Sequence, residues 1–214
     1  MRITPKKTSK VTEVIKSHIT ENLKAYIMVS LIMLIGIILG VIFVNNLNET
    51  QIQDVQTYLQ GFTGSLKDGK SINSGELLKK SLGNNLIFVL FMWFVGSTVI
   101  GIPIVLGIVA FRGFCLGYTI SSAIKIWGTS KGILFFVTSI LLQNLVTMPC
   151  IIALAVSGIK LYKSIIKDKR RENIKIEIIR HTIFSLMILV ILAIASIIET
   201  YLSTNLLILF KNNF

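Results

Sequence analysis

The chain has 214 residues, of which 53% are hydrophobic and only 15% are charged. So few charges cannot cover the surface of a water-soluble domain of this size, which excludes an ordinary soluble protein. The net charge of +12 could indicate a nucleic-acid-binding protein, but the basic residues lie beside long apolar segments rather than in a separate basic domain. We therefore expect a multi-pass protein of the cell membrane, which contacts lipid and no nucleic acid.

The first apolar segment follows a basic N-terminal segment. Residues 1–24 carry six Lys or Arg against two Glu, and residues 25–44 contain no charge. About 20 apolar residues in a helix cross the hydrocarbon core of a bilayer. A cleaved signal peptide would have a shorter core and a small-residue cleavage site, whereas this segment is full length and ends in VNNLNET. We expect residues 1–24 in the cytoplasm and an uncleaved first span at 25–44, which opens a single membrane domain, 25–214.

Residues 45–80 form the one sizeable loop between predicted spans, and we expect this loop to be external and helical. Apolar side chains recur in it at three- and four-residue steps, the period of one helix face. A second short helix is expected to start near residues 73–74. One interpretation is that both helices lie on the bundle or on the lipid interface. The other is that the first helix binds a protein partner. Its candidate contact residues are Ile52, Val55, Tyr58, Leu59 and Phe62.

The next apolar block, residues 86–111, is interrupted by Gly101-Ile102-Pro103 and is followed by Arg112. Proline removes a backbone donor and disfavours helical geometry in the residue before it. Arg112 then lies either within a span that begins at the Gly-Pro break or in a cytoplasmic turn. An arginine at the membrane centre costs at least about 2.5 kcal/mol. We therefore prefer the turn, with spans at residues 86–107 and 113–127.

Two further spans are expected at residues 132–159 and 181–200. Between them, residues 160–180 carry eight Lys or Arg against three acidic residues, a net charge of +5, while the N-terminal segment has +4 and the loop 45–80 is neutral. Because cytoplasmic loops carry the excess of Lys and Arg, both basic segments should be cytoplasmic, with an even number of crossings between them. The predicted fold is an all-α polytopic bundle of about five spans, with the N-terminus inside and the C-terminus outside.

Small residues at four-residue spacing predict how the spans pack, because they let two helix backbones approach closely in lipid. These contacts could lie within one chain or form the seam of a homo-oligomer, and the pattern leaves both open. The candidate packing residues are Gly36, Gly40, Gly113, Gly117 and Ser121.

Few polar residues and no catalytic motif occur within the predicted spans. Gln143, Asn144 and Thr147 either bond a neighbouring span or line a substrate path, since a buried amide in hydrocarbon needs a partner. The sequence contains no zinc-protease, serine-hydrolase or P-loop motif and no acidic pair within a span. Both cysteines, Cys115 and Cys150, lie in apolar segments without zinc-site spacing. We therefore expect no enzyme, and no catalytic, cofactor or metal site.

The segment GIPIVLGIVAFRGFCLGYTISSAI, followed by LLQNLVTMPCIIALA, a basic loop and a final span, resembles the stage II sporulation protein M family. The resemblance extends from Tyr26 to about Tyr201. It implies a polytopic membrane component of the engulfment machinery in endospore formation. By the same resemblance, the protein would anchor and localise peptidoglycan-remodelling hydrolases, the sporulation proteins SpoIIP and SpoIID, at the septal membrane. The family offers no active-site residue to carry over.

Two function classes follow from these expectations. The first is a non-enzymatic scaffold that makes its contacts through the loop 45–80 and the faces of the bundle. The second is the permease subunit of a transporter, for which residues 163–180 could supply a cytoplasmic coupling helix. Co-purification separates the two, since extracellular hydrolases favour the scaffold and a cytoplasmic ATPase favours the permease.

The basic segment 160–180 should bind the anionic inner leaflet through Lys167, Lys169, Arg170 and Arg171. Each Lys or Arg near such a surface contributes about 1 kcal/mol. Replacing all four with Gln should therefore disturb membrane insertion or orientation, as measured by thiol accessibility in intact cells. Unchanged insertion and orientation would contradict this role.

Overall fold

The computed structural model describes residues 18–67, 74–98, 100–167, 171–198 and 200. These residues form helices joined by short turns, with no strand among them. The helices are α2 (Leu23–Asn45), α3 (Glu49–Lys67), α4 (Ser74–Gly96), α5 (Gly101–Trp127), α6 (Thr129–Phe135), the π-helical turn η1 (Phe136–Leu141), α7 (Leu142–Lys167) and α8 (Arg171–Ile198). The predicted all-α fold is confirmed.

Four helical stretches of the described chain are long and apolar enough to cross a membrane: Leu23–Asn45, Gly101–Thr138, Asn144–Ile166 and Ile174–Ile198. α4 is not one of these candidate spans, because only its second half, from Leu86, is continuously apolar. Large apolar side chains lie exposed along the outer faces, such as Leu34 on α2 and Leu186 on α8, as contact with lipid tails requires. The count of five spans and their orientation stay predictions.

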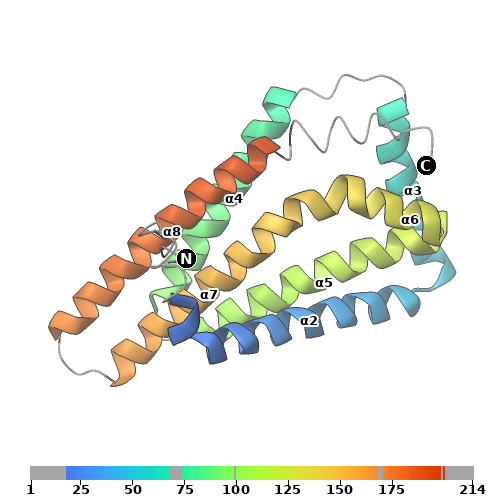
Figure 1. Ribbon diagram of the computed structural model, residues 1–214. Coiled ribbons are helices and arrows are strands. Elements are labelled where there is room, and N and C mark those ends of the chain that lie inside the picture. Colours follow the sequence, from blue (N-terminus) through green and yellow to red (C-terminus); the bar gives the residue numbers. More distant parts are fainter. Residues whose placement is uncertain (1–17, 68–73, 99, 168–170, 199, 201–214) are drawn as a thin grey trace, which may run out of the picture.

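The helices form two groups that diverge from each other (Figure 1). α2 packs along α5 in one group, and α4 packs along α8 in the other; α7 contacts both groups and has its most extensive contact with α8. The groups meet where Gly96 of α4 lies against Gly158 of α7, with the position of a Gly96 Cβ only 3.5 Å from the Gly158 Cα. Most of the buried apolar side chains come from α2, α4, α5, α7 and α8 and form one core.

The two predicted basic segments reach the same end of the bundle. Lys160 Nζ lies 3.7 Å from Glu21 Oε2, which joins the end of the membrane part of α7 to the start of α2. We call the end of the bundle that holds this ion pair the basic end. At the opposite end, Lys125 Nζ donates a hydrogen bond of 2.9 Å to the Val44 carbonyl, so α2 and α5 also finish together. The placement of both basic segments at one end agrees with the charge argument from the sequence.

The predicted spans 86–107 and 113–127, with a turn at Arg112, are wrong. α4 ends at Gly96, and α5 then runs without a break from Gly101 to Trp127. Pro103 lies in the first turn of α5, where backbone N–H groups have no intrahelical acceptor, so its missing donor costs nothing there. The Gly-Pro sequence therefore starts a helix instead of interrupting one, and Arg112 lies near the middle of that helix.

The remaining boundaries also differ from those predicted. The segment 132–159 is divided among α6, η1 and α7, and the helices extend into the basic segment 160–180, since α7 ends at Lys167 and α8 begins at Arg171. The helix expected to start near residues 73–74 does so, but it continues as α4 into the apolar segment. Pro149 lies within α7, about two turns after η1. Helix propensity of the Lys-, Arg- and Glu-rich sequence carries α7 and α8 beyond their apolar parts.

Glycines hold α2 and α5 in direct backbone contact. A Cβ placed on Gly36 would lie 2.1 Å from the Ala110 carbonyl oxygen. A Cβ placed on Gly117 would lie 2.1 Å from the Ile37 carbonyl oxygen. At Gly40 and Gly113 the corresponding distances, to Phe114 O and Met33 O, are both 2.3 Å. The contacts advance in the same direction along both helices, so the pair is parallel and lies within one chain. Ser121, on the same helix, is half-buried.

Gly117→Leu should destabilise the protein, because its side chain would overlap the backbone of α2. Overpacking costs about 1–3 kcal/mol and occasionally more, and backbone is harder to displace than a side chain. Gly107→Leu is the matched control, since Gly107 is on the same helix with nothing within 4 Å of its Cβ position. Thermal unfolding in detergent should show a lower midpoint for the first variant alone. Equal midpoints would contradict the packing role.

The two ends of the bundle should lie on opposite sides of the membrane. In a background with Cys115→Ala and Cys150→Ala, an impermeant maleimide should label Ser130→Cys on intact cells and Lys163→Cys only after permeabilisation. Residue 130 lies in α6 at the opposite end, and residue 163 follows Lys160 at the basic end. Labelling of position 163 from outside would refute this orientation.

Candidate functional site

Arg112 lies near the middle of α5, within a helical stretch that is long and apolar enough to cross a membrane. Its guanidinium carbon lies 4.9 Å from the centre of the Phe88 ring on α4, a cation–π contact. A charge at this depth is costly, and intramembrane ionisable residues usually mark a functional site. The described residues form two ion pairs, Lys160 with Glu21 and Arg180 with Glu177, and Arg112 belongs to neither.

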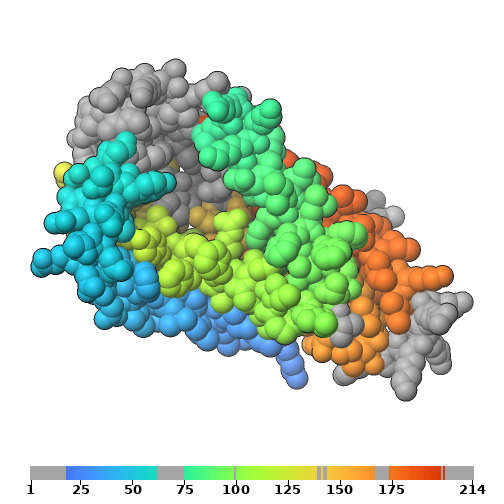
Figure 2. All heavy atoms as spheres, turned by 180° about the vertical axis from the view of Figure 1, so that it is seen from behind, coloured from blue at the N-terminus to red at the C-terminus, as the bar shows by residue number. Residues whose placement is uncertain are grey.

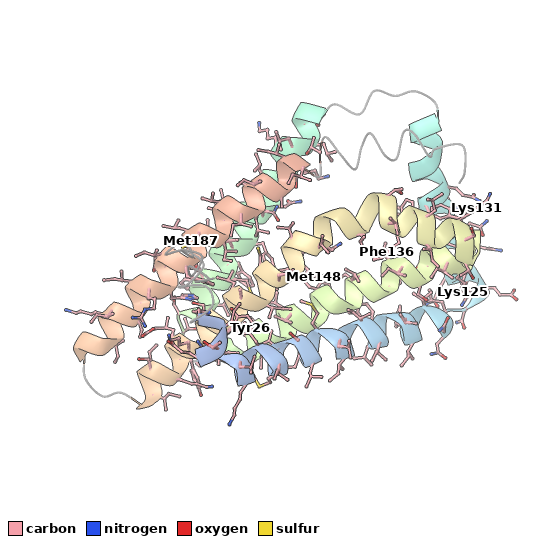
Figure 3. All side chains as sticks on the ribbon, viewed as in Figure 1. Tyr26, Lys125, Lys131, Phe136, Met148 and Met187 are labelled. Atoms are coloured by element: carbon pink, nitrogen blue, oxygen red, sulfur yellow. The ribbon has the colours of Figure 1, made fainter. Side chains whose placement is uncertain are left out.

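A cavity of about 170 Å³ lies beside Arg112, between α4, α5 and α7. Its α7 wall includes Met148, which is labelled in Figure 3. Seen from behind, α3 and α4 lie on either side of α5 (Figure 2). The lining residues are Asn85, Arg112, Cys115, Leu116, Thr119, Asn144, Thr147 and Met148.

The cavity is polar although apolar helices surround it. Asn85 is only 7% exposed and donates from Nδ2 to the Ser196 hydroxyl at 2.7 Å, which ties the cavity wall to α8. Thr147 is 5% exposed, and its Oγ1 has no hydrogen-bond partner among the described residues. A positive charge, two amides and two threonines therefore surround a space with room for a polar group.

This site combines residues that the sequence indicated with residues that it did not. Asn144 and Thr147 were expected either to bond a neighbouring span or to line a path, and both line the cavity. Arg112 was placed in a turn, and Asn85 was given no role. The signal for Arg112 was its isolation in an otherwise uncharged segment of helical length. The side chain of Gln143 lies outside the described part of the structure.

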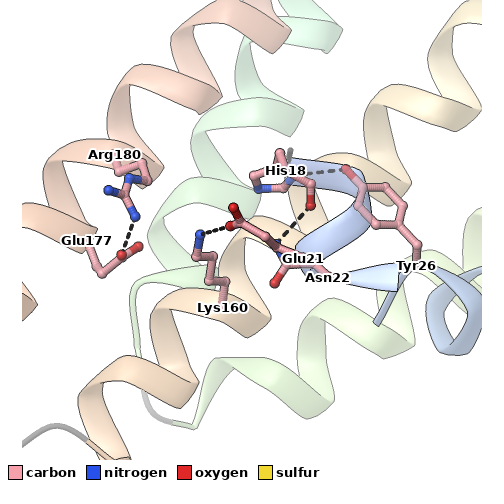
Figure 4. Close-up of polar contacts among 7 residues, drawn as sticks. All are labelled: His18, Glu21, Asn22, Tyr26, Lys160, Glu177 and Arg180. Carbon is pink, nitrogen blue, oxygen red and sulfur yellow. Dashed lines mark hydrogen bonds and ion pairs between the residues drawn. The ribbon is translucent and has the colours of Figure 1, made fainter. Parts of the chain in front are cut away.

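A second polar cluster fixes the basic end (Figure 4). The His18 ring stacks on Phe184 of α8 with the ring centres 4.8 Å apart, and its Nδ1 lies 3.2 Å from the Tyr26 hydroxyl. Burial lowers the pKa of His18 below its ordinary value of 6.5, and the positive charge of Lys160 acts in the same direction. The ring is therefore neutral near pH 7, which favours its stacked position. This cluster attaches the start of α2 to α7 and α8.

Behind this cluster, Ser157 of α7 and His181 of α8 share a buried hydrogen bond of 2.8 Å between Oγ and Nδ1. His181 is 2% exposed, so its ring lies in the interior although the residue follows the exposed Arg180. Its Nε2 lies 3.3 Å from the Cβ position of Gly96 on α4. The pair connects α7 to α8 where α4 ends.

The candidate partner-binding residues of α3 face in different directions. Leu59 is 8% exposed, and together with Val55 and Tyr118 of α5 it lines a largely apolar cavity of about 310 Å³ between α3 and α5. Ile52 lines a smaller space that Val44 and Lys125 share. Tyr58 is 77% exposed. The face with Ile52, Val55 and Leu59 therefore packs on the bundle, and Tyr58 lies at the border of the larger cavity with most of its side chain exposed.

Two groups of expected residues cannot be placed in full. The Phe62 side chain lies outside the described part, although the residue belongs to α3. Of the four residues expected at the lipid headgroups, Lys169 and Arg170 lie outside the described residues, while Lys167 ends α7 and Arg171 begins α8.

The fold and the intramembrane site define a polytopic helical membrane protein. The sequence profile of stage II sporulation protein M matches residues 29–204, which is most of the chain. The chain therefore belongs to the stage II sporulation protein M family, and this confirms the resemblance seen in the sequence. No significant match was found among curated proteins or among solved structures.

Ser157→Ala should lower stability, because it leaves the buried His181 ring without its hydrogen bond. An unsatisfied buried polar group costs about 1–3 kcal/mol. Ser185→Ala is the matched control: Ser185 is equally buried on α8, but its hydroxyl bonds only the His181 carbonyl of its own helix. Thermal unfolding in detergent should show a clear loss for Ser157→Ala alone. Equal midpoints would contradict the importance of this bond.

Proposed function

We propose that this protein is a non-enzymatic membrane scaffold that anchors and localises peptidoglycan-remodelling enzymes at the septal membrane during engulfment. The observation that carries this proposal is the family match over residues 29–204. The match makes the chain a sporulation-related membrane protein. Its proposed partners are the wall hydrolases that the family resemblance implies, which resemble SpoIIP and SpoIID.

The end of the bundle opposite the basic end offers a surface for such partners. If the basic end is cytoplasmic, this end faces the wall, where the hydrolases act. α3 lies there against α5, and its exposed residues include Gln51 together with Asp54 and Tyr58, which border the cavity between the two helices. An exposed tyrosine beside polar side chains is typical of the centre of a protein-binding surface. Compared with the sequence-based set, the contact surface is therefore reduced to the exposed residues of α3 around Tyr58.

A permease subunit is the second candidate, and the polar cavity at Arg112 is the observation that favours it. A solute path needs polar groups at membrane depth, and Asn85, Arg112 and Asn144 provide them. Purification from native membranes distinguishes the candidates, since a scaffold would retain extracellular hydrolases and a permease would retain a cytoplasmic ATPase.

The recruitment test replaces Tyr58 with Ala, because this side chain contributes little to the bundle. We expect normal membrane levels, but loss of hydrolase co-purification and of hydrolase accumulation at the septum. Thr57→Ala, one residue away and also exposed, is the control that should leave recruitment intact. If the Tyr58→Ala variant still recruits the hydrolases, the contact surface does not include Tyr58. A deletion strain that completes engulfment normally would refute the function itself.

A further inference from the structure

Among the residues that the structure describes, the positive charge of Arg112 has no acidic partner. No acidic side chain occurs among the residues that line the cavity beside Arg112, and no carboxylate pairs with Arg112 in the described chain. The Phe88 ring on one side provides a cation–π contact, and no residue in the described part of the chain accepts a hydrogen bond from the guanidinium. A charge in this position is stabilised most effectively by an anion that can accept those hydrogen bonds.

The neutral residues of the cavity suit the same kind of ligand. Thr147 Oγ1 is buried and has no partner in the described part of the chain, so its hydroxyl can donate to a bound oxygen. The Thr119 hydroxyl donates its hydrogen to the Cys115 carbonyl oxygen at 2.7 Å. The Thr119 oxygen can therefore only accept a hydrogen bond from a ligand. Asn85 and Asn144 bring amide groups from α4 and α7. Polar groups from α4 and α7 therefore lie around the positive charge of Arg112 on α5, and the Thr147 hydroxyl is the neutral donor among them.

The size and position of the cavity favour a ligand larger than water. A single water needs about 10–15 Å³ of such space, and the cavity offers about 170 Å³. α4 and α8 diverge from α5 and α7 in the direction away from the basic end (Figure 1). The cavity lies between these two groups, where an oxyanion on a lipid or a free anion would meet Arg112.

We propose that this cavity binds a phosphate-type oxyanion, with Arg112 as its cationic ligand and Thr147 as a neutral donor. The planar guanidinium matches the oxygens of a phosphate ester, and one arginine balances the single charge of a phosphodiester. The phosphate group is supplied by an anionic lipid headgroup or by free phosphate. Such a site makes the protein a receptor for an anionic ligand, which is independent of enzyme recruitment by α3.

The test uses the full-length protein in dodecyl maltoside with three added probes: phosphatidylglycerol, diacylglycerol and inorganic phosphate. A ligand that binds only the folded state raises the unfolding temperature in a concentration-dependent manner. A rise with phosphatidylglycerol alone identifies the lipid as the source, and a rise with inorganic phosphate identifies the free anion. An equal rise with diacylglycerol, which has no phosphate, would overturn the proposal, and so would no response to either phosphate probe.

Two variants then assign the binding to these residues. Arg112→Gln should lower the affinity for the phosphate probe that binds the wild type by about ten- to hundred-fold, the range expected for loss of a hydrogen bond to a charged group. Arg180→Gln is the control, because Arg180 is an exposed arginine paired with Glu177 at the basic end. Unchanged affinity in Arg112→Gln would refute the site.

Thr147→Val covers the case in which Arg112→Gln does not fold. Valine has nearly the shape of threonine and removes the unpartnered hydroxyl, so the unliganded protein should be as stable as the wild type or more stable. The same variant should nevertheless bind the phosphate probe several-fold more weakly, because a donor is lost. A variant that is destabilised without ligand and binds the probe as tightly as the wild type would show a purely structural role for Thr147.

Discussion

The direct backbone contact between α2 and α5 is the constraint on which the rest of the bundle depends. Lipid tails are as apolar as leucine side chains, so helices in a bilayer associate through close packing rather than through burial from water. Gly36 and Gly40 on α2 lie against the α5 backbone at Ala110 and Phe114, and Gly113 and Gly117 on α5 lie against the α2 backbone at Met33 and Ile37. Because the two helices are parallel, the chain must return between them, which α3 and α4 accomplish.

This arrangement also determines what surrounds Arg112. Successive residues of an α-helix are rotated by about 100°, so Arg112 cannot share the α2-facing side of α5 with its neighbour Gly113. It lies instead against the returning helix, where α4 supplies Phe88 and Asn85. α7 closes the third side with Asn144 and Thr147. The helix pairing that stabilises the bundle thus produces a charged, polar cavity within it.

Local patterns in the sequence predicted the helices, the glycine packing residues and the shared end of both basic segments, because each depends on spacing or charge within one segment. The turn at Arg112 was wrong because the energy of a lone buried arginine was counted without the Phe88 ring and the polar groups of other helices. The different exposure of Leu59 and Tyr58 could not be predicted from the sequence, because it depends on where α5 lies relative to α3. Contacts between distant segments, such as Asn85 with Ser196, leave no periodic signal.

The parallel α2–α5 pair is tested most directly by thiol cross-linking within one chain. In the background with Cys115→Ala and Cys150→Ala, Val44→Cys combined with Lys125→Cys should be joined by a short thiol-specific reagent, since the Lys125 side chain reaches the Val44 carbonyl. Tyr26→Cys combined with Lys125→Cys should stay unlinked, because these positions lie at opposite ends. Mass spectrometry of the digested monomer reads out both pairs. Linkage of the second pair without the first would contradict the parallel arrangement.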